Sequence, residues 1–398
     1  MSVSRAKAIF LYCIVSAFLV FEMGVQVSPS VMTSQLMHDL NISTFGLGLM
    51  SGIYFYTYAA MQIPSGILFD HFKSRVILTS AILICALGTL LFSFAPNIYL
   101  GSLARSLMGF GSAFAFVSVL VVTADLFSHK HFALITGITQ MLAALGAMLG
   151  QIPLSHAVII FGWHRAMFYL AIMGFILALL SWLFLNYEKN KIVTTHQDYL
   201  WKNLKKIFTN KQTWFIALYA CLLWTPMSGF ASLWGVPYLM TAHHLTHTQS
   251  ATLSAMMWLG LALASPLLGW LSTFIRRRVF PLAISALLGF MCFAILLFFS
   301  DLSVWMIGAL IFLAGGACAG QALSFTCVKE NNGEHQRGAA IAMNNMAVVI
   351  SGAIFQPLIG KLLENFHGNF QIVLMTILIC YAVGAVTAAF LVKESFSK

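Results

Sequence analysis

The chain of 398 residues alternates between apolar runs and shorter polar connections. The apolar runs reach the roughly 20 residues that a helix needs to cross a ~30 Å hydrocarbon core. They recur from the N-terminus almost to the last residue. We predict about twelve transmembrane helices, near residues 6–28, 44–69, 75–95, 98–124, 132–158, 163–186, 213–240, 248–272, 279–299, 303–328, 338–363 and 371–392.

Composition strengthens this picture. Charged residues make up 8% of the chain and hydrophobic residues 60%, whereas a soluble domain carries about 25% charge. The first apolar run follows Arg5 and Lys7 like a secretory signal, but no small-residue cleavage site follows it and Glu22 interrupts it. The sequence therefore predicts an all-α polytopic protein of the inner (cytoplasmic) membrane that retains its first helix.

The basic charge is distributed unevenly along the chain. If the N-terminus is cytoplasmic, eighteen of the 21 Lys and Arg residues fall in cytoplasmic connections, and only Arg165 and Lys361 fall in outer ones. This asymmetry is the positive-inside pattern of membrane proteins. It predicts cytoplasmic termini and an even number of spans, and it accounts for the net charge of +10 without a nucleic-acid partner.

One long polar connection divides the apolar runs six and six. We predict an N-terminal bundle at 1–185, a cytoplasmic linker at 186–212 and a C-terminal bundle at 213–398. Within the linker, Leu200, Trp201 and Leu204 recur at helical spacing opposite lysines. This pattern predicts a short amphipathic helix on the inner leaflet; a calmodulin-type target has the same pattern.

The two halves repeat a short motif. GILFDHFKSR begins at Gly66 and GWLSTFIRRR begins at Gly269, each after the second helix of its half. The two segments lie 203 residues apart and share their first, third and last positions. Two copies of a six-helix unit explain this spacing.

The first copy resembles the loop signature of the major facilitator superfamily of secondary transporters, and the resemblance covers the whole chain. Gly66, Asp70 and Arg75 match the signature, while His71 and Lys73 depart from it. The resemblance implies two pseudo-symmetric six-helix bundles and a cytoplasmic gate formed by Asp70, Lys73 and Arg75. A plainer interpretation is that Lys73 and Arg75 only anchor the topology.

Helix four holds a second signature of this family, formed by Arg105, Gly109 and Gly111. An arginine this far inside a lipid-buried helix needs a partner or a wet cavity. Glu22 lies at a similar depth in helix one, and the resemblance implies that helices one, four, seven and ten line a central cavity. We therefore expect Glu22 and Arg105 within reach of each other.

A buried carboxyl can take up a proton when a substrate removes the cation that stabilises its charge. We assign proton coupling to Glu22 and anion contact to Arg105. Two alternatives stay open: a static ion pair that fixes the packing of the helices, and an outward-snorkelling Arg105.

Other polar and aromatic residues on the predicted helices are candidate substrate contacts. The alternative for each of them is a purely structural role as an interhelical hydrogen-bond partner. The candidates are Gln26, Tyr54, Tyr58, Gln140, Trp224, Trp234, Gln321, Asn344 and Asn345.

No catalytic constellation or cofactor motif is present, and we predict neither enzymatic activity nor a cofactor. His243 and His247 share a helical spacing that suits a metal, but no acid or cysteine lies near them in sequence. We expect an exposed loop there and no metal. Trp163, His164 and Arg165 are predicted to anchor the outer interface.

These observations favour a proton-coupled symporter of a small polar organic solute, such as an organic anion, amino acid or short peptide. The alternative is a proton-antiport exporter of a metallophore or drug. Gly137, Gly146 and Gly150 match the glycine spacing of the superfamily's antiporters, but Gln151 stands where their proline does. A non-transporting sensor or membrane enzyme is a third class. We expect a monomer in the bilayer, with protons and a small molecule as its partners.

Overall fold

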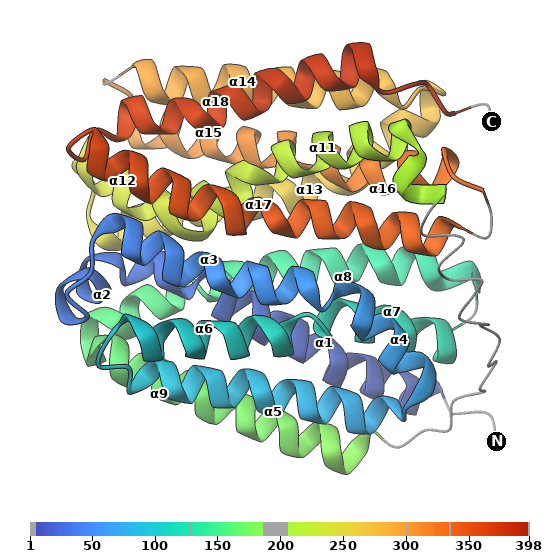
Figure 1. Ribbon diagram of the computed structural model, residues 1–398, viewed down its shortest axis with the longest axis horizontal. Helices are drawn as coiled ribbons and strands as arrows, with labels where there is room; N and C mark the ends of the chain where they lie inside the picture. Colours follow the sequence, from blue (N-terminus) through green and yellow to red (C-terminus); the bar gives the residue numbers. More distant parts are fainter. Residues whose placement is uncertain (1–4, 128, 186–205, 300, 334–335, 397–398) are drawn as a thin grey trace. The chain divides into compact units, whose positions relative to one another are not determined.

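The computed structural model describes residues 5–127, 129–185, 206–299, 301–333 and 336–396, and every regular element in these ranges is helical (Figure 1). Contacts divide the chain into two compact units, Met1–Val193 and Thr194–Lys398. Residues 186–205, including the predicted amphipathic segment at Leu200, Trp201 and Leu204, lie outside the described part. The predicted domain boundaries therefore stay predictions.

Unit 1 contains the helical elements coloured blue to green in Figure 1. In order they are α1 (Arg5–Val27), η1 (Ser28–Val31), α2 (Thr33–Asp39), α3 (Thr44–Ala60), α4 (Gln62–His71), α5 (Ser74–Ser93), α6 (Ile98–Ser112), α7 (Ala115–Leu126), α8 (His129–Leu149) and α9 (Ile152–Phe184).

Unit 2 contains the elements coloured yellow-green to red. They are α11 (Lys211–Thr225), the π-helix η2 (Pro226–Trp234), α12 (Gly235–Ala242), α13 (His247–Phe274), α14 (Val279–Phe298), α15 (Val304–Ala317), α16 (Gly320–Glu330), α17 (Arg337–Asn365), α18 (Phe370–Val386) and η4 (Thr387–Leu391).

Ten segments of the described residues are long and apolar enough to cross a membrane. One of them, Gly137–Phe184, is 48 residues long and covers two predicted spans, with a kink at Gly162 (φ 76°, ψ 159°) where the sequence predicts a break. The predicted span at 44–69 corresponds to α3 and α4 and is not among the ten. The count of twelve spans stays a prediction.

Several predicted helices are divided, and prolines account for two of the breaks. The predicted helix at 44–69 breaks at Met61, because Pro64 in the first turn of α4 has no N–H to give to the carbonyl of Ala60. The predicted helix at 132–158 breaks at Gly150 and Gln151, just before Pro153 in the first turn of α9.

Polar side chains fix where many helices begin. A Ser, Thr or Asn directly before the helix accepts a hydrogen bond from a backbone amide of the first turn, which satisfies a donor that has no partner inside the helix. The residues that do this are Ser43 for α3, Asn97 for α6, Asn210 for α11, Thr246 for α13, Ser303 for α15 and Asn369 for α18.

The two units repeat the same helix contacts. In unit 1, α3 packs on α6, α5 on α6 and α9, and α1 on α8; in unit 2, α13 packs on α15, α14 on α15 and α18, and α11 on α17. In both units the predicted fourth helix is broken at the corresponding place, between α6 and α7 and between α15 and α16. The internal repeat is therefore visible in the packing as well as in the sequence.

Glycines make the closest of these repeated contacts. A Cβ atom at Gly109 of α6 would overlap the main-chain oxygen of Tyr54 on α3, and one at Gly315 of α15 would overlap the main-chain oxygen of Met257 on α13. Small residues allow this close approach of helix backbones in membrane proteins. The glycine of the second family signature thus has a packing role that is duplicated in unit 2.

We expect Gly109→Ala to destabilise the protein by about 1 to 3 kcal/mol, because the added methyl group overlaps main-chain atoms that cannot rotate away. Thermal unfolding in detergent measures this loss. Gly137→Ala is the matched control, since a Cβ atom there meets nothing within 4 Å. Equal melting temperatures for the two variants would contradict the close approach of α3 and α6.

Candidate functional site

Glu22 lies in the second half of α1 and is buried, with 1% of its surface exposed. The Tyr54 hydroxyl of α3 donates a hydrogen bond to Glu22 Oε2 at 2.9 Å. Tyr54 is itself buried. The carboxyl is therefore held by a neutral phenol in the interior of unit 1.

Arg105 lies in α6 and is fully buried. Its Nη1 donates to the main-chain oxygen of Val25 at 3.0 Å, and its Nη2 donates to that of Gln26 at 3.3 Å. Both acceptors lie in the last turn of α1. The side chain points into the unit, which excludes the outward-snorkelling alternative.

A proline explains why α1 offers a carbonyl to Arg105. In a regular helix the oxygen of Val25 would accept from the amide of residue 29, but Pro29 has no N–H. The Ser28 hydroxyl donates to this oxygen at 2.9 Å, and Arg105 supplies a second donor. Arg105 thus satisfies the end of α1 inside a membrane span, where water is scarce.

Tyr54 also contacts Arg105. The guanidinium carbon lies 4.6 Å from the centre of the Tyr54 ring, within the range of a cation–π interaction. Among the described residues, Glu22 and Arg105 form no ion pair. The two charged groups, which the sequence predicts within reach of each other, lie against different parts of one tyrosine.

The other candidates of unit 1 lie around this tyrosine or on α8. Tyr58 is buried, with its ring 6.0 Å from that of Tyr54. Gln26 is buried and contributes its main-chain oxygen to Arg105. Gln140 is half-buried on α8, next to the Thr139 hydroxyl that lies 3.0 Å from Tyr12 of α1. The structure brings Tyr58 and Gln26 to the site, whereas Gln140 lies on a different helix, α8.

The candidates of unit 2 lie on α11, η2, α16 and α17. Trp234 Nε1 donates to the main-chain oxygen of Gln356 at 3.1 Å, and Gln356 Nε2 donates to that of Ser228 at 2.8 Å. These bonds join the π-helix to α17. Trp234 therefore has a structural partner within unit 2.

The remaining candidates of unit 2 are aromatic or amide side chains. Trp224 is half-buried, with its ring 6.2 Å from that of Trp258 on α13. Asn344 Nδ2 donates to the Ser324 hydroxyl at 2.8 Å. Gln321 is buried and Asn345 is half-buried. All five candidates of this unit thus sit on helical elements that pack on at least one other element of the group.

Of the three predicted gate residues, the structure describes the side chains of Lys73 and Arg75 and not that of Asp70. Asp70 lies in α4, but its side chain is outside the described part of the structure. Lys73 is exposed directly before α5. The Arg75 guanidinium carbon lies 4.1 Å from the centre of the Trp182 ring on α9. The predicted gate contacts of these residues stay predictions.

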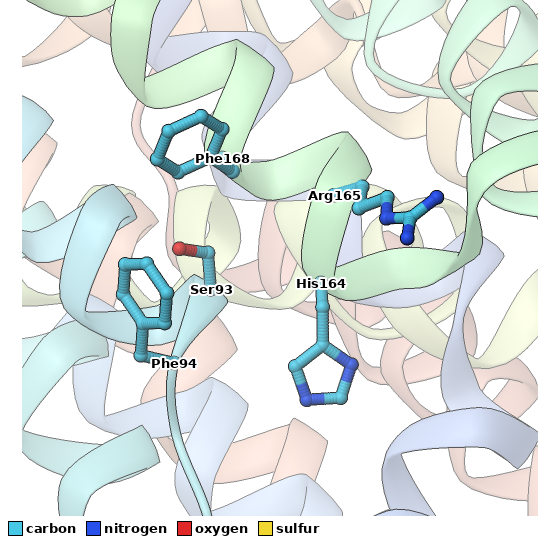
Figure 2. Close-up of a pocket in the computed structure, with 5 residues that line it drawn as sticks. All are labelled: Ser93, Phe94, His164, Arg165 and Phe168. Carbon is cyan, nitrogen blue, oxygen red and sulfur yellow. The ribbon is translucent and has the colours of Figure 1, made fainter.

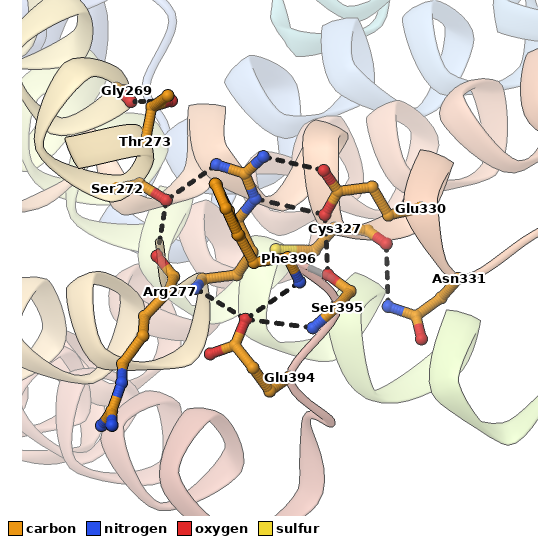
Figure 3. A network of polar contacts seen from close by, with 11 residues as sticks. Gly269, Ser272, Thr273, Arg277, Cys327, Glu330, Asn331, Glu394, Ser395 and Phe396 are labelled. Atoms are coloured by element: carbon orange, nitrogen blue, oxygen red, sulfur yellow. Dashed lines mark hydrogen bonds and ion pairs between the residues drawn. The ribbon is translucent and has the colours of Figure 1, made fainter. Parts of the chain in front are cut away.

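Arg278, the counterpart of Arg75 in the repeat, binds several polar groups that Figure 3 labels, among them Ser272, Glu330 and Glu394. Its Nη2 and Nε bind the two carboxylate oxygens of Glu330 at 2.8 and 3.2 Å, and its Nη1 donates to the Ser272 hydroxyl at 2.9 Å. The Ser395 hydroxyl donates to Glu330 at 2.8 Å. This two-point contact fixes the end of α16 to the start of α14.

The C-terminal segment joins the same network. Glu394 accepts hydrogen bonds from the backbone amides of Arg278 at 2.8 Å and Val279 at 3.2 Å, at the N-terminus of α14. A carboxylate at this position satisfies free amides and complements the helix dipole. The Phe396 ring lies 4.6 Å from the Arg278 guanidinium carbon.

Comparison with models of known protein families shows to which family the chain belongs. A family model described as Major Facilitator Superfamily matches residues 14–355 and 227–397. The chain belongs to the Major Facilitator Superfamily. It is a multi-pass membrane protein, and superfamily members are transporters that bind small-molecule substrates and not enzymes.

The chain is similar to three proteins that are named as transporters. It is 25% identical over 222 residues to the uncharacterized transporter YybO of Bacillus subtilis, which is 52% of this chain and 51% of that protein. It is 28% identical over 141 residues to the probable sulfoacetate transporter SauU of Cupriavidus necator. This match covers 35% of this chain and 33% of that protein. It is 22% identical over 396 residues to the probable L-galactonate transporter of Escherichia coli. This match covers 92% of this chain and 85% of that protein. The matched region spans about half of the first relative and a third of the second.

Solved structures agree with the superfamily fold. A bacterial homologue of the human lysosomal transporter Spinster matches with a TM-score of 0.75 in its inward-facing unoccupied form and 0.76 in its occupied form. The sequence identities are 17% and 16%, and both matches cover 98% of this chain and 96% of the other. This likeness confirms the superfamily fold alone.

Sequence reasoning missed Trp258. It is buried, and its Nε1 has no hydrogen-bond partner among the described residues. The same holds for Asn344 Oδ1 and Gln356 Oε1. A useful signal was the repeat itself, because Trp258 follows Met257, which aligns with Tyr54 at the offset of 203. Unpaired polar atoms of this kind are expensive to bury and are therefore candidate ligand contacts.

Potential metal ligands are scattered in the part of the chain that the structure describes. Within the described residues, no group of three or more His, Cys, Asp or Glu could hold a metal ion. His243 lies 3.2 Å from the Tyr238 hydroxyl. The sequence spacing of His243 and His247 is thus not accompanied by further ligands in the part of the chain that the structure describes.

The contacts of Glu394 affect its ionisation. Partial burial raises the pKa of this carboxyl. Hydrogen bonds from the backbone amides of Arg278, Val279, Phe396 and Ser395 together lower the pKa by more than burial raises it, so the pKa lies below the ordinary 4.5. A carboxyl with a lowered pKa in the folded state stabilises the protein above its unfolded pKa. This stabilisation is lost as the pH falls through the folded-state pKa.

We expect Glu394→Gln to lower the melting temperature at neutral pH and to have little effect below the folded-state pKa, where the carboxyl is protonated in both states. Thermal unfolding in detergent across this range measures the difference. Asp301→Asn, which removes an exposed carboxyl outside the network, is the control. A Glu394→Gln effect that is as large in acid as at neutral pH would refute the ionised carboxylate cap.

Proposed function

We propose that the protein is a proton-coupled symporter of a small polar organic anion, working by alternating access in the inner membrane as a monomer. Glu22 carries the proton and Arg105 contacts the anion. The observation that supports this most strongly is the contact of both groups with Tyr54 in the interior of unit 1.

The surroundings of Glu22 suit a group that gains and loses a proton. Its carboxyl is buried and its described polar partner is the Tyr54 hydroxyl, which carries no charge. An ionised carboxylate without a cation is costly in such a place, and uptake of a proton removes that cost. A static ion pair would instead have kept the carboxylate permanently ionised.

The surroundings of Arg105 suit a group that exchanges partners. Two of its nitrogens donate to main-chain oxygens, and its Nε is buried without a hydrogen-bond partner among the described residues. A carboxylate or sulfonate offers a guanidinium stronger, charge-assisted hydrogen bonds than neutral carbonyls do. Because Arg105 is fully buried in this conformation, an anion reaches it only after neighbouring side chains move.

Tyr54 provides the coupling in this proposal. Its hydroxyl donates to the ionised form of Glu22 while its ring lies against the cation of Arg105. An anion that draws the guanidinium away from the ring changes the position of the phenol and hence the stability of the Glu22 charge. Proton uptake and anion binding then favour the same conformation.

The named relatives agree with an anionic substrate. Sulfoacetate and L-galactonate, which appear in the names of two relatives, are both organic anions. Amino acids and short peptides also carry a carboxylate that Arg105 could bind.

Proton-antiport export is the alternative. It rested on the glycines of the predicted fifth helix, and the structure gives two of them a packing cause. A Cβ atom at Gly146 of α8, or at Gly150 directly after α8, would meet the backbone of α1 at Val20 or Gly24. Close packing of α1 and α8 therefore accounts for these glycines without antiport. Symport stays the better-supported direction of coupling.

Proteoliposomes with an imposed pH gradient test the proposal, with L-galactonate and sulfoacetate as the first probes. We expect Glu22→Gln to abolish gradient-driven accumulation and to retain exchange of labelled for unlabelled anion, because the neutral side chain mimics the protonated form. Arg105→Gln should lose both activities, since it removes the anion contact. Reconstituted amounts and melting temperatures are compared in parallel.

Glu364→Gln is the matched control, because Glu364 is partly exposed and pairs with Lys361 at 3.0 Å. It should transport like the unmodified protein. Gradient-driven accumulation that survived in Glu22→Gln would refute the coupling role. Unchanged anion affinity in a folded Arg105→Gln protein would refute the anion contact.

A further inference from the structure

A cavity of about 390 Å³ opens in unit 1, away from the site around Tyr54. Its lining residues come from the end of α5 and from the middle of α9 (Figure 2). In this view Ser93, Phe94 and Phe168 lie on one side, and the Arg165 guanidinium extends away from the two rings. The cavity thus combines an apolar wall with a cation at its edge.

The cavity lies at the end of an apolar span. α5 ends at Ser93, and the kink at Gly162 in α9 lies directly before His164 and Arg165. The positive-inside pattern predicts that this end of unit 1 faces the non-cytoplasmic side. The cavity is therefore at the depth where lipid headgroups meet acyl chains.

Trp163 is not the interface anchor that its sequence position predicts. It is 1% exposed, and its Nε1 donates to Asp39 Oδ2 at 2.8 Å. Asp39 Oδ1 lies 2.8 Å from His38 Nδ1, so both carboxylate oxygens have partners other than Arg165. The buried tryptophan fixes the chain directly before His164, which its ring contacts with 3.7 Å between centroids.

Arg165 has no carboxylate within ion-pair distance among the described residues. The other basic residue predicted on this side of the membrane, Lys361, pairs with Glu364 at 3.0 Å. Basic residues are depleted on the non-cytoplasmic side of membrane proteins. An uncompensated arginine there, beside an aromatic cavity, is suited to an anionic ligand that also has an apolar part.

The apolar wall of the cavity is formed by two exposed aromatic side chains. Phe94 is 64% exposed and Phe168 is 36% exposed, with their rings 6.1 Å apart in an edge-on arrangement. Beyond them along α9, Ile172 and Met173 are also exposed. Exposed apolar side chains on a membrane-crossing helix are suited to contact with lipid.

We propose that this cavity binds an anionic glycerophospholipid. The phosphate lies at Arg165, and an acyl chain lies along Phe94 and Phe168. A free inorganic anion has no apolar part that would contact the aromatic wall. A zwitterionic lipid also carries a positive group, and repulsion between that group and the guanidinium offsets part of the attraction of its phosphate. The site would hold a specific lipid against unit 1 where α9 is kinked.

Native mass spectrometry of the full-length protein with added phosphatidylglycerol or phosphatidylcholine tests the proposal. We expect preferential retention of phosphatidylglycerol, and we expect Arg165→Gln to reduce that retention about fivefold, the effect of one basic residue at an anionic membrane surface. Lys361→Gln is the matched control and should leave retention unchanged. A photoactivatable phosphatidylglycerol with its reactive group on the acyl chain should label peptides that contain Phe94 or Phe168.

Three results would overturn the site. They are equal retention of the two lipids by the unmodified protein, equal loss in Arg165→Gln and Lys361→Gln, and labelling confined to other peptides. Displacement of the lipid by inorganic phosphate alone would also overturn it, because a simple anion site would then suffice. Phe168→Ala should reduce acyl-chain labelling in a protein that melts like the unmodified one, which separates the apolar contact from misfolding.

Discussion

The contact of Arg105 with the end of α1 is the interaction on which the interior of unit 1 depends. Within a bilayer every main-chain carbonyl and every charge needs a partner inside the protein. Pro29 leaves the Val25 oxygen without its helical amide, and Arg105 supplies a donor from α6. One side chain thereby ends a helix, joins two helices and places a cation beside Tyr54. Each of these consequences follows from a single missing N–H.

The repeat gives both units the same framework and different chemistry. Gly109 and Gly315 bring equivalent helices together in the two units. On that framework unit 1 holds the buried Glu22 and Arg105, whereas the interior of unit 2 holds Trp258, Asn344 and other uncharged groups. A partly buried ion pair of unit 2 lies instead at the start of α14, where Arg278 binds Glu330. A duplicated fold has thus been given one charged interior and one polar aromatic interior.

The sequence was sufficient for the membrane class, the internal repeat and the superfamily, because these depend on apolar run length and on motif spacing. It also identified Glu22 and Arg105 as buried charges, since lipid makes such residues rare. It did not give their partners. A helix that is apolar on nearly all faces carries little information on its rotation, so the position of Tyr54 between the two charges could not be read from spacing. The position of a charged residue along its helix predicted its burial, but it did not predict which neighbouring helix the side chain faces.

Local backbone chemistry caused the other differences. The effects of Pro29, Pro64 and Gly162 on helix ends depend on a few dihedral angles, and they redirected Arg105, divided the predicted second helix and kinked α9. The burial of Trp163 follows from its bond to Asp39, a residue 124 positions away in sequence. Composition near a membrane interface favours an exposed tryptophan, and one long-range carboxylate was enough to reverse that expectation.

A double-mutant cycle with Tyr54→Phe and Glu22→Gln tests the central contact most directly. Tyr54→Phe removes the hydroxyl that reaches Glu22 and retains the ring that faces Arg105. Reversible unfolding in mixed micelles should give a coupling energy above about 1 kcal/mol, because the bond is buried and involves an ionisable acceptor. A coupling energy near zero, with each single variant folded, would contradict the account of a tyrosine that links the carboxyl to the arginine.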